Sequence, residues 1–454
     1  MTAGKIFRKH FARNRLVAIY NKRIRHSGAI GLDRTRPAAL ASTLREEVAL
    51  ILRKVHDGRY HFTAYKEKLI SKGAASLPRQ ISVPTARDRI VLRALCDCLS
   101  EIYPTAKISL PQVVIDSLKN ALLSNTYSAY AKIDLKNFYP SLPHSQMKSV
   151  IWKKVRKKEF RHLIESAITT PTVPESLGGK GASSTKIGVP QGLAISNVLA
   201  EISLNDIDVN YSNRSGIWYK RYVDDILILA NRDNIETIAT ELIRDLKNIG
   251  LNPHDFGQDS KSKIADITEA FTFLGYSVEG ESLLIPQKSI LRFESSIAKI
   301  FTAYRHKLAT ARSPADKERA LAYCAWKINL RITGCYFEGK RLGWVSYYSQ
   351  ITSTSQLRSV NHTIQKLTHR FVPSGEIKPK SLIKTFYELR RGADGKHAYI
   401  VNLDTCTLAT KRNLLAMWIG NKAFSLSPER VERMFLTRVA KAVSELEEDI
   451  AQAS

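Results

Sequence analysis

The sequence predicts an α+β fold built on an antiparallel β-sheet, and three observations support this class. Two apolar and aromatic runs, residues 218–222 and 226–230, flank an Asp-Asp pair, which is typical of a β-hairpin with two carboxylates at its tip. Residues 128–134 alternate as a strand does and end in an aspartate. Apolar residues three and four apart predict helices over 198–207 and 233–249, the second opening with a capping box. Two helices against the sheet form a split βαβ arrangement.

The Asp-Asp pair, Asp224 and Asp225, is the first indication of chemistry. Adjacent carboxylates repel each other, so the pairing favours a bound cation; a solvated Asp-Asp turn is the alternative. Asp134 ends its strand and could meet the hairpin tip across the sheet, completing a hard-oxygen site for two Mg²⁺ ions. Between these strands lies a loop punctuated by Gly and Pro, residues 188–197, which leads into an apolar helix.

The order of these parts resembles the reverse transcriptases. Residues 222–225, Tyr-Val-Asp-Asp, are similar to that family's Tyr-x-Asp-Asp box, residues 134–141 to its first metal-binding strand, and residues 189–197 to its Pro-Gln-Gly loop. The resemblance extends from about residue 31 to about residue 286. It implies an RNA-directed DNA polymerase, a nucleotidyltransferase shaped as a right hand with fingers, palm and helical thumb.

The resemblance also implies a catalytic site with two metal ions. One Mg²⁺ would be held by Asp134 and Asp224, and the second by Asp134 with the backbone carbonyl of Leu135. Asp225 would support the site more than ligate it, and Mn²⁺ could replace Mg²⁺.

Further residues match nucleotide-binding positions of the family. Tyr139 matches the aromatic gate that clashes with a ribose 2′-hydroxyl, which indicates dNTP substrates. Gln191 and Gly192 would line the nucleotide and the templating base. Lys261 and Lys263 are alternatives for a lysine that protonates the leaving pyrophosphate.

Residues 72–89 look like a fingers hairpin. Lys72 and Arg79 match the lysine and arginine that clasp the triphosphate, and Arg87 either joins them or braces a neighbouring carboxylate. Ordinary surface charge on strands is the alternative.

A further hairpin is predicted over residues 271–285. It resembles the primer grip, which implies Phe273, Leu274 and Gly275 as primer-grip residues, while an ordinary edge hairpin is the alternative. The domain boundaries that we expect are a basic helical N-terminal extension (1–65), fingers (66–127), palm with a fingers insertion around 145–187 (128–286), helical thumb (287–372) and C-terminal extension (373–454).

Composition agrees with a nucleic-acid partner. A net charge of +28 and a pI near 9.9 are typical of proteins that bind polyphosphate, although an anionic membrane surface would also attract them. Residues 1–30 contain no acidic residue and predict a basic amphipathic helix, either contacting RNA or simply lying at the surface. No apolar run is long enough to span a bilayer, and the start lacks a signal-peptide core. The five cysteines form no C-x-x-C unit, which favours free thiols in a reducing cytoplasm.

The subtype is predicted from residues 192–197, Gly-Leu-x-x-Ser-Asn. Asn197 stands where retroelement enzymes commonly carry proline, and this form resembles the bacterial abortive-infection and defence-associated reverse transcriptases. The expected partners are a noncoding RNA template, the DNA product and dNTPs, with no membrane, and a homo-oligomer is left open. Retron and group II intron enzymes, protein priming from Tyr387 or Tyr399, and a non-enzymatic RNA-binding scaffold are the alternatives.

Overall fold

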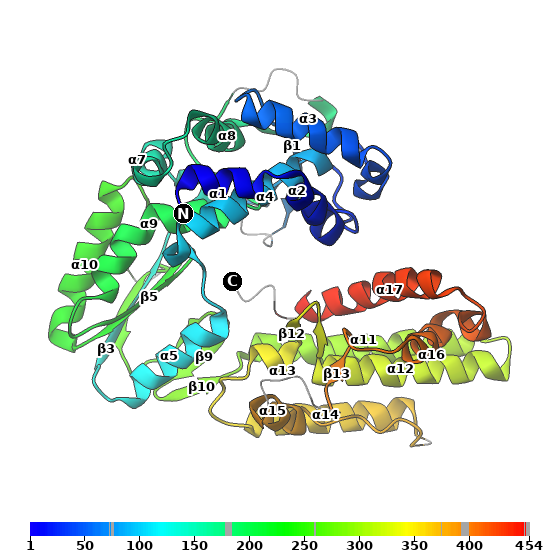
Figure 1. The fold of residues 1–454 in the computed structure, drawn as a ribbon. Helices are drawn as coiled ribbons and strands as arrows, with labels where there is room; N and C mark the ends of the chain where they lie inside the picture. Colours follow the sequence, from blue (N-terminus) through cyan, green and yellow to red (C-terminus); the bar gives the residue numbers. More distant parts are fainter. Residues whose placement is uncertain are drawn as a thin grey trace. The chain divides into compact units, whose positions relative to one another are not determined.

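The computed structural model describes residues 1–71, 73, 77–177, 184–257, 260–373, 375–391, 399–448 and 450. The chain divides into two compact units: residues 1–109 with 126–266, and residues 110–125 with 267–454. Helices and mainly antiparallel strands in both units confirm the α+β class (Figure 1).

The main sheet of the first unit has four antiparallel strands in the order β5-β6-β3-β7. They are β3 (Ala129–Asp134), β5 (Trp218–Tyr222), β6 (Asp225–Ala230) and β7 (Lys263–Asp266). The predicted hairpin is the β5-β6 pair, and in register Asp134 lies directly opposite Asp225. Every residue of β6 after Asp225 is fully buried, because this strand is flanked on both sides and covered by helices.

Two helices pack on this sheet, as the periodicity predicted. α9 (Ser196–Ser212) contacts β5, and α10 (Arg232–Asn248) contacts β3 and β6 (Figure 1). The capping box expected at residues 233–236 is wrong, because α10 begins at Arg232 with Asn231 at its N-cap, so Asp233 already lies inside the helix. The free N–H of Arg232 donates instead to the Ser128 hydroxyl at 2.9 Å, so the neighbouring strand completes the helix end.

The rest of the first unit surrounds a small sheet in which β1 (Tyr65–Ile70) pairs antiparallel with β2 (Arg79–Val83) and parallel with β4 (Thr172–Val173). Its helices are α1 (Ala3–His10), α2 (Arg13–Ile19), the π-helix η1 (Tyr20–Ile24), the 3-10 helix η2 (Pro37–Ala41), α3 (Leu44–His56), α4 (Ala86–Ile102), η3 (Pro104–Ala106), α6 (Phe138–Ser141), α7 (His144–Lys154), α8 (Lys158–Thr169) and η4 (Glu175–Leu177). The basic N-terminal segment therefore forms consecutive short helices in place of a single one. The five residues whose helical spacing predicted an apolar face are buried: Phe7, Phe11, Leu16, Tyr20 and Ile24.

The second unit combines a helical assembly with two three-stranded sheets. Its helices are α5 (Pro111–Leu123), α11 (Gln287–Ala309), α12 (Pro314–Thr333), α13 (Trp344–Tyr347), α14 (Ser355–Phe371), α15 (Leu382–Arg391), α16 (Leu408–Ile419), η5 (Gly420–Ala423) and α17 (Pro428–Glu448). The strands β8 (Phe271–Phe273), β9 (Tyr276–Glu279) and β10 (Ser282–Leu284) form two hairpins that share β9, where we expected a single hairpin.

The other sheet of this unit joins segments that are far apart in the sequence. β11 (Cys335–Phe337) pairs antiparallel with β12 (Lys340–Leu342) and parallel with β13 (Val401–Asn402). Leu330, Cys335, Phe337 and Leu403 share one hydrophobic core with buried residues of α16 and α17. Across the described part of the chain, no helix has both the length and the apolar character needed to cross a membrane.

Candidate active site

Three predicted carboxylates lie at one edge of the main sheet. Asp134 ends β3, Asp224 occupies the turn after β5, and Asp225 begins β6. Backbone hydrogen bonds fix this arrangement: the N–H of Leu135 donates to the Asp224 carbonyl at 3.2 Å, and the N–H of His254 donates to the Asp134 carbonyl at 2.9 Å. The antiparallel register therefore brings residues ninety positions apart to one place.

The carboxylates at this edge are partly removed from water and repel one another. Burial raises the pKa of Asp225 to about 6, and the charges of Asp134 and Asp224 add to the increase although Lys132 opposes it. Burial likewise raises the pKa of Asp224, and Asp134 contributes. Asp225 Oδ1 is buried without a hydrogen-bond partner among the described residues, and Lys132 Nζ lies 3.5 Å from it.

These carboxylates fit a divalent cation. The donor set is the hard oxygen type that Mg²⁺ and Mn²⁺ prefer, and an unpartnered buried carboxylate oxygen is a group that a cation would satisfy. Within the described ranges, no three His, Cys, Asp or Glu side chains already form a complete ligand cluster. Mg²⁺ commonly uses one or two carboxylates and takes its other ligands from water and substrate phosphates, so the arrangement suits that mode of binding.

Two basic side chains contact Asp134. Lys261 Nζ lies 3.8 Å from Asp134 Oδ2, and its side chain is 72% exposed. His254 Nε2 lies 3.4 Å from the same oxygen, and burial lowers the pKa of the imidazole although Asp134 opposes this. Lys263 begins β7 opposite Lys132, whereas Lys261 contacts Asp134. His254 was not predicted; only the packing of its loop against the end of β3 brings it here.

A cavity of about 680 Å³ adjoins these carboxylates in the first unit. Arg79, Gln191 and Asp224 all belong to its lining, so three predicted site residues from distant segments share one space. The positive charge of Arg79 also opposes the rise in the pKa of Asp224. Tyr139 and Gly192 are not among the residues that line this cavity.

Tyr139 is held in place by its hydroxyl, which donates to Asn197 Oδ1 at 2.6 Å. Burial, together with the charges of Glu201 and Asp224, raises the pKa of Tyr139, so the hydroxyl keeps its proton and can donate. Asn197, which distinguished the subtype in the sequence, therefore has a direct contact with the predicted gate.

Gly192 lies where the Pro-Gln-Gly loop approaches β2. The N–H of Ser82 donates to the Gln191 carbonyl at 2.6 Å, and Gly192 has φ +101°. A Cβ at this position would lie 2.8 Å from Ile81 Cγ2 and 3.0 Å from the Ser82 carbonyl oxygen. Only glycine combines this φ with this proximity.

We expect Gly192→Ala to destabilise the protein by roughly 1–3 kcal/mol, since it adds backbone strain and a steric clash. Gly216→Ala is a matched control, because Gly216 has φ +76° but open space around its Cβ position. Chemical denaturation of the two variants compares them. If both variants lose the same free energy of unfolding, the positive φ alone explains the effect. That result would contradict a close approach between the loop and β2.

Other predicted residues lie outside this group. Arg87 is engaged by Glu47 of α3, with Nη2 to Oε1 at 2.8 Å, so it braces a carboxylate, the second of its two predicted roles. Lys72 lies outside the described residues.

The primer-grip residues belong to the second unit. Phe273 ends β8, and Leu274 and Gly275 form the turn into β9 with φ +45° and +74°. The Tyr347 hydroxyl donates to the Leu274 carbonyl at 2.9 Å, which ties this turn to α13. Of the two tyrosines considered for priming, Tyr387 is 49% exposed, whereas the Tyr399 hydroxyl accepts a hydrogen bond from the Ser381 N–H at 2.7 Å.

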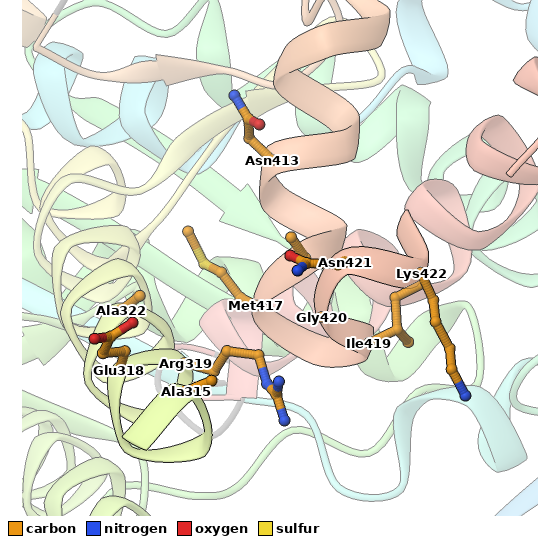
Figure 2. Close-up of a pocket in the computed structure, with 11 residues that line it drawn as sticks. Ala315, Glu318, Arg319, Ala322, Asn413, Met417, Ile419, Gly420, Asn421 and Lys422 are labelled. Carbon is orange, nitrogen blue, oxygen red and sulfur yellow. The ribbon is translucent and has the colours of Figure 1, made fainter. Parts of the chain in front are cut away.

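A second cavity, of about 800 Å³, is lined by α12, α16 and η5 in the second unit. Figure 2 shows Glu318 and Arg319 of α12 beside Gly420 and Met417. None of the predicted site residues lines it. The chemistry that the sequence indicates is therefore concentrated in the first unit.

Comparison with known proteins agrees with this placement. Residues 70–278 match the family described as "Reverse transcriptase (RNA-dependent DNA polymerase)". Protein YkfC of Escherichia coli (strain K12) is 22% identical over 333 residues, which cover 61% of this chain and 84% of that protein. An uncharacterized 91 kDa protein in cob intron of Schizosaccharomyces pombe is 24% identical over 250 residues, which cover 50% of this chain and 30% of that protein.

Among solved structures, telomerase from Candida albicans in complex with a fragment of telomeric RNA has a TM-score of 0.44 and 14% identity, covering 92% of this chain and 69% of that chain. Apo telomerase from Candida tropicalis has a TM-score of 0.41 and 15% identity, covering 91% and 72%. The family match contains both carboxylate strands and the Pro-Gln-Gly loop. Residues 70–278 are therefore a reverse transcriptase domain, and the reaction of this domain is RNA-directed DNA polymerisation.

Proposed function

We propose that this chain copies RNA into DNA by two-metal catalysis at Asp134, Asp224 and Asp225. The observation that carries the proposal is the convergence of these carboxylates at one sheet edge, with raised pKa values at Asp224 and Asp225 and one buried oxygen lacking a hydrogen bond. Lys132 Nζ lies 3.5 Å from Asp225 Oδ1, and among the described residues no basic side chain is recorded as contacting the carboxylate of Asp224. A domain matched to the reverse transcriptases over the same residues supports this interpretation.

The side chains around the carboxylates have distinct tasks in this proposal. Divalent ions bound there would lower the pKa of the primer 3′-hydroxyl and neutralise charge on the triphosphate. Arg79, which shares a cavity with Gln191 and Asp224, would bind phosphate oxygens through its planar guanidinium. Lys261 is exposed beside Asp134, and from that position it would protonate a leaving pyrophosphate.

The assay for this function is extension of a DNA primer on an RNA template with dNTPs and Mg²⁺ or Mn²⁺. Extension that requires the template is expected. Sequencing of RNA and DNA that co-purify with the protein from its native host would then identify the template. Absence of extension with every divalent cation and with the co-purified RNA would favour the scaffold alternative.

Tyr139 is the residue that we propose for sugar selection. We expect Tyr139→Ala to increase incorporation of ribonucleotides relative to dNTPs, by up to ~10²-fold, because removing the ring makes room for a 2′-hydroxyl. Tyr139→Phe keeps the ring and loses only the hydrogen bond to Asn197, so it should stay close to the wild type. The ratio of kcat/KM for the two sugars measures the effect, and an unchanged ratio in Tyr139→Ala would remove Tyr139 from this role.

The RNA partner that we propose is a structured noncoding RNA. Exposed basic side chains of the N-terminal helices support it, since no acidic residue lies within residues 1–30 to neutralise them: Arg13, Arg15, Lys22, Arg23 and Arg25. Such side chains supply phosphate contacts, which provide much of the affinity for RNA without reading its sequence. Sequence selection would then come from other parts of the chain.

For the biological role we propose antiphage defence through the DNA product. The Gly-Leu-x-x-Ser-Asn form of residues 192–197 supports this role, and Asn197 has a structural contact with Tyr139. An intron-type role is the second candidate, favoured by the relative whose name places it in a cob intron. The two roles predict different outcomes in cells.

A further inference from the structure

Arg221 is a buried arginine next to the Tyr-Val-Asp-Asp turn, and sequence analysis gave it no role. Its side chain is 1% exposed and contacts two carboxylates of α9. Nη2 lies 2.8 Å from Glu201 Oε2 and 2.5 Å from Asp208 Oδ2, and Nε donates to Asp208 Oδ1 at 2.9 Å. Glu201 and Asp208 are seven residues apart and so lie on one face of the helix.

The same guanidinium also reaches the catalytic turn. Its Nη1 donates to the Val223 carbonyl at 3.0 Å, in addition to Glu201 Oε1 at 2.9 Å. Because this planar fork has five donors in fixed directions, it can bind two helix carboxylates and a backbone carbonyl at once. Lysine, with a single ammonium group, cannot reproduce that geometry.

The turn needs external support. Val223 has φ +59°, a left-handed conformation that is costly for a β-branched residue. Such conformations are strained and persist only when the surroundings impose them. Here the carbonyl of Val223 is held by Arg221, and the next carbonyl, of Asp224, accepts from the Leu135 N–H at 3.2 Å. Contacts from both sides therefore fix the turn.

The helix that anchors Arg221 also bounds the Pro-Gln-Gly loop. α9 begins at Ser196, whose hydroxyl donates to the Pro190 carbonyl at 2.6 Å, and it continues through both carboxylates. We propose that Arg221 is a positioning residue of the polymerase site, which ties the Val223 carbonyl to α9 and so keeps Asp224 and Asp225 at the sheet edge in register with the loop. This inference rests on the proposed function of those aspartates.

The alternative is that Arg221 only stabilises the fold, and a rescue experiment separates the two. Arg221→Lys keeps the charge but loses the fork, so we expect kcat for dNTP incorporation to fall by about 10²-fold, with a smaller change in KM. Adding Val223→Gly should restore much of the rate, because glycine adopts φ above zero without support. A residue that acted only on stability would not be rescued by a change at position 223.

Binding of Mn²⁺, followed by electron paramagnetic resonance without nucleotide, is a readout that needs no turnover. Arg221→Lys should raise the Kd for Mn²⁺ by roughly tenfold, and Val223→Gly in the same chain should reverse this. Arg214→Lys is the matched control: Arg214 pairs with Glu241 at 2.6 Å in the same unit, and among the described residues no contact is recorded between it and the turn. It should keep wild-type affinity and rate.

These measurements decide the inference separately from the proposed function. If the wild-type chain shows no polymerase activity, the proposed function is wrong. Mn²⁺ binding would still test whether Arg221 positions the turn. Wild-type Mn²⁺ affinity in Arg221→Lys, or a loss that Val223→Gly does not reverse, overturns the inference. If Arg221→Lys fails to fold, Glu201→Gln loosens one anchor of the fork and should show the same losses at smaller size, and unchanged affinity there overturns it equally.

Discussion

Asp224→Asn and Asp134→Asn are each expected to reduce DNA synthesis by roughly 10³-fold or more, the scale seen when a group that stabilises a phosphoryl-transfer transition state is lost. Asparagine keeps the shape of the side chain and removes the charge that attracts the cation. Primer extension under single-turnover conditions measures the loss. RNA binding should stay near the wild-type level, because the proposed phosphate contacts come from basic side chains of the N-terminal helices and not from these carboxylates.

The free energy of unfolding of the aspartate variants shows whether a loss of activity comes from the missing carboxylate or from a destabilised fold. The pKa of Asp225 rises from 3.8 to about 6 on folding, so the folded state holds the proton more tightly than the unfolded state. Stability therefore falls as pH increases from about 4 to about 6, and the ionised carboxylate destabilises the metal-free fold at neutral pH.

We accordingly expect Asp225→Asn to stabilise the metal-free protein at pH 7 by roughly 1–3 kcal/mol, in contrast to its loss of activity. The burial of Asp224 predicts the same direction for Asp224→Asn. Thermal unfolding with a chelator present measures this, with Asp233→Asn on the exposed start of α10 as the control. If the inactive variants also unfold at a lower temperature, their lost activity results from a damaged fold. That outcome would contradict the prediction of a metal site at these carboxylates.

The sheet edge could be predicted because strand periodicity and hairpin register leave few choices. Once residues 218–230 form a tight hairpin, Asp225 begins the central strand, and the alternation of residues 128–134 places Asp134 at the end of a neighbouring strand. The apolar spacing of α10 follows the same logic. Local patterns of this kind determine which side chains share a face.

Contacts between elements could not be predicted in this way. Arg87 pairs with Glu47, forty positions away, because α3 packs beside α4, and no local pattern encodes that packing. His254 reaches Asp134 through an irregular loop. The strands β11 and β13 are too short for a period of two to be read, so their parallel pairing depends on the core that α16 and α17 build around them.

The same limitation applies to Arg221 and to the gate tyrosine. An arginine before the aspartate turn has the sequence pattern of an ordinary exposed strand residue, yet it is buried against two carboxylates of α9. The link between Tyr139 and Asn197 likewise depends on the approach of α6 to the start of α9. In both cases the sequence names the residue types, and only tertiary packing supplies the partner.

Cells that carry this gene with its native neighbouring sequence are expected to resist at least some phages, and the protection should disappear when Asp224 and Asp225 are both replaced by alanine. Defence through a DNA product requires catalysis, and the two carboxylates are the groups whose loss should stop it with least effect on the fold. Asp233→Ala with Glu236→Ala is the matched control, because it removes two exposed carboxylates of the same unit away from the sheet edge. Plaque counts over a broad phage panel, with equal protein levels verified, give the measurement. Equal plaque counts for the intact and the Asp224/Asp225 variants would refute the defence role. New genomic insertions that need the same two aspartates would instead establish the intron-type role, because mobility inserts the DNA product into the genome as a new copy.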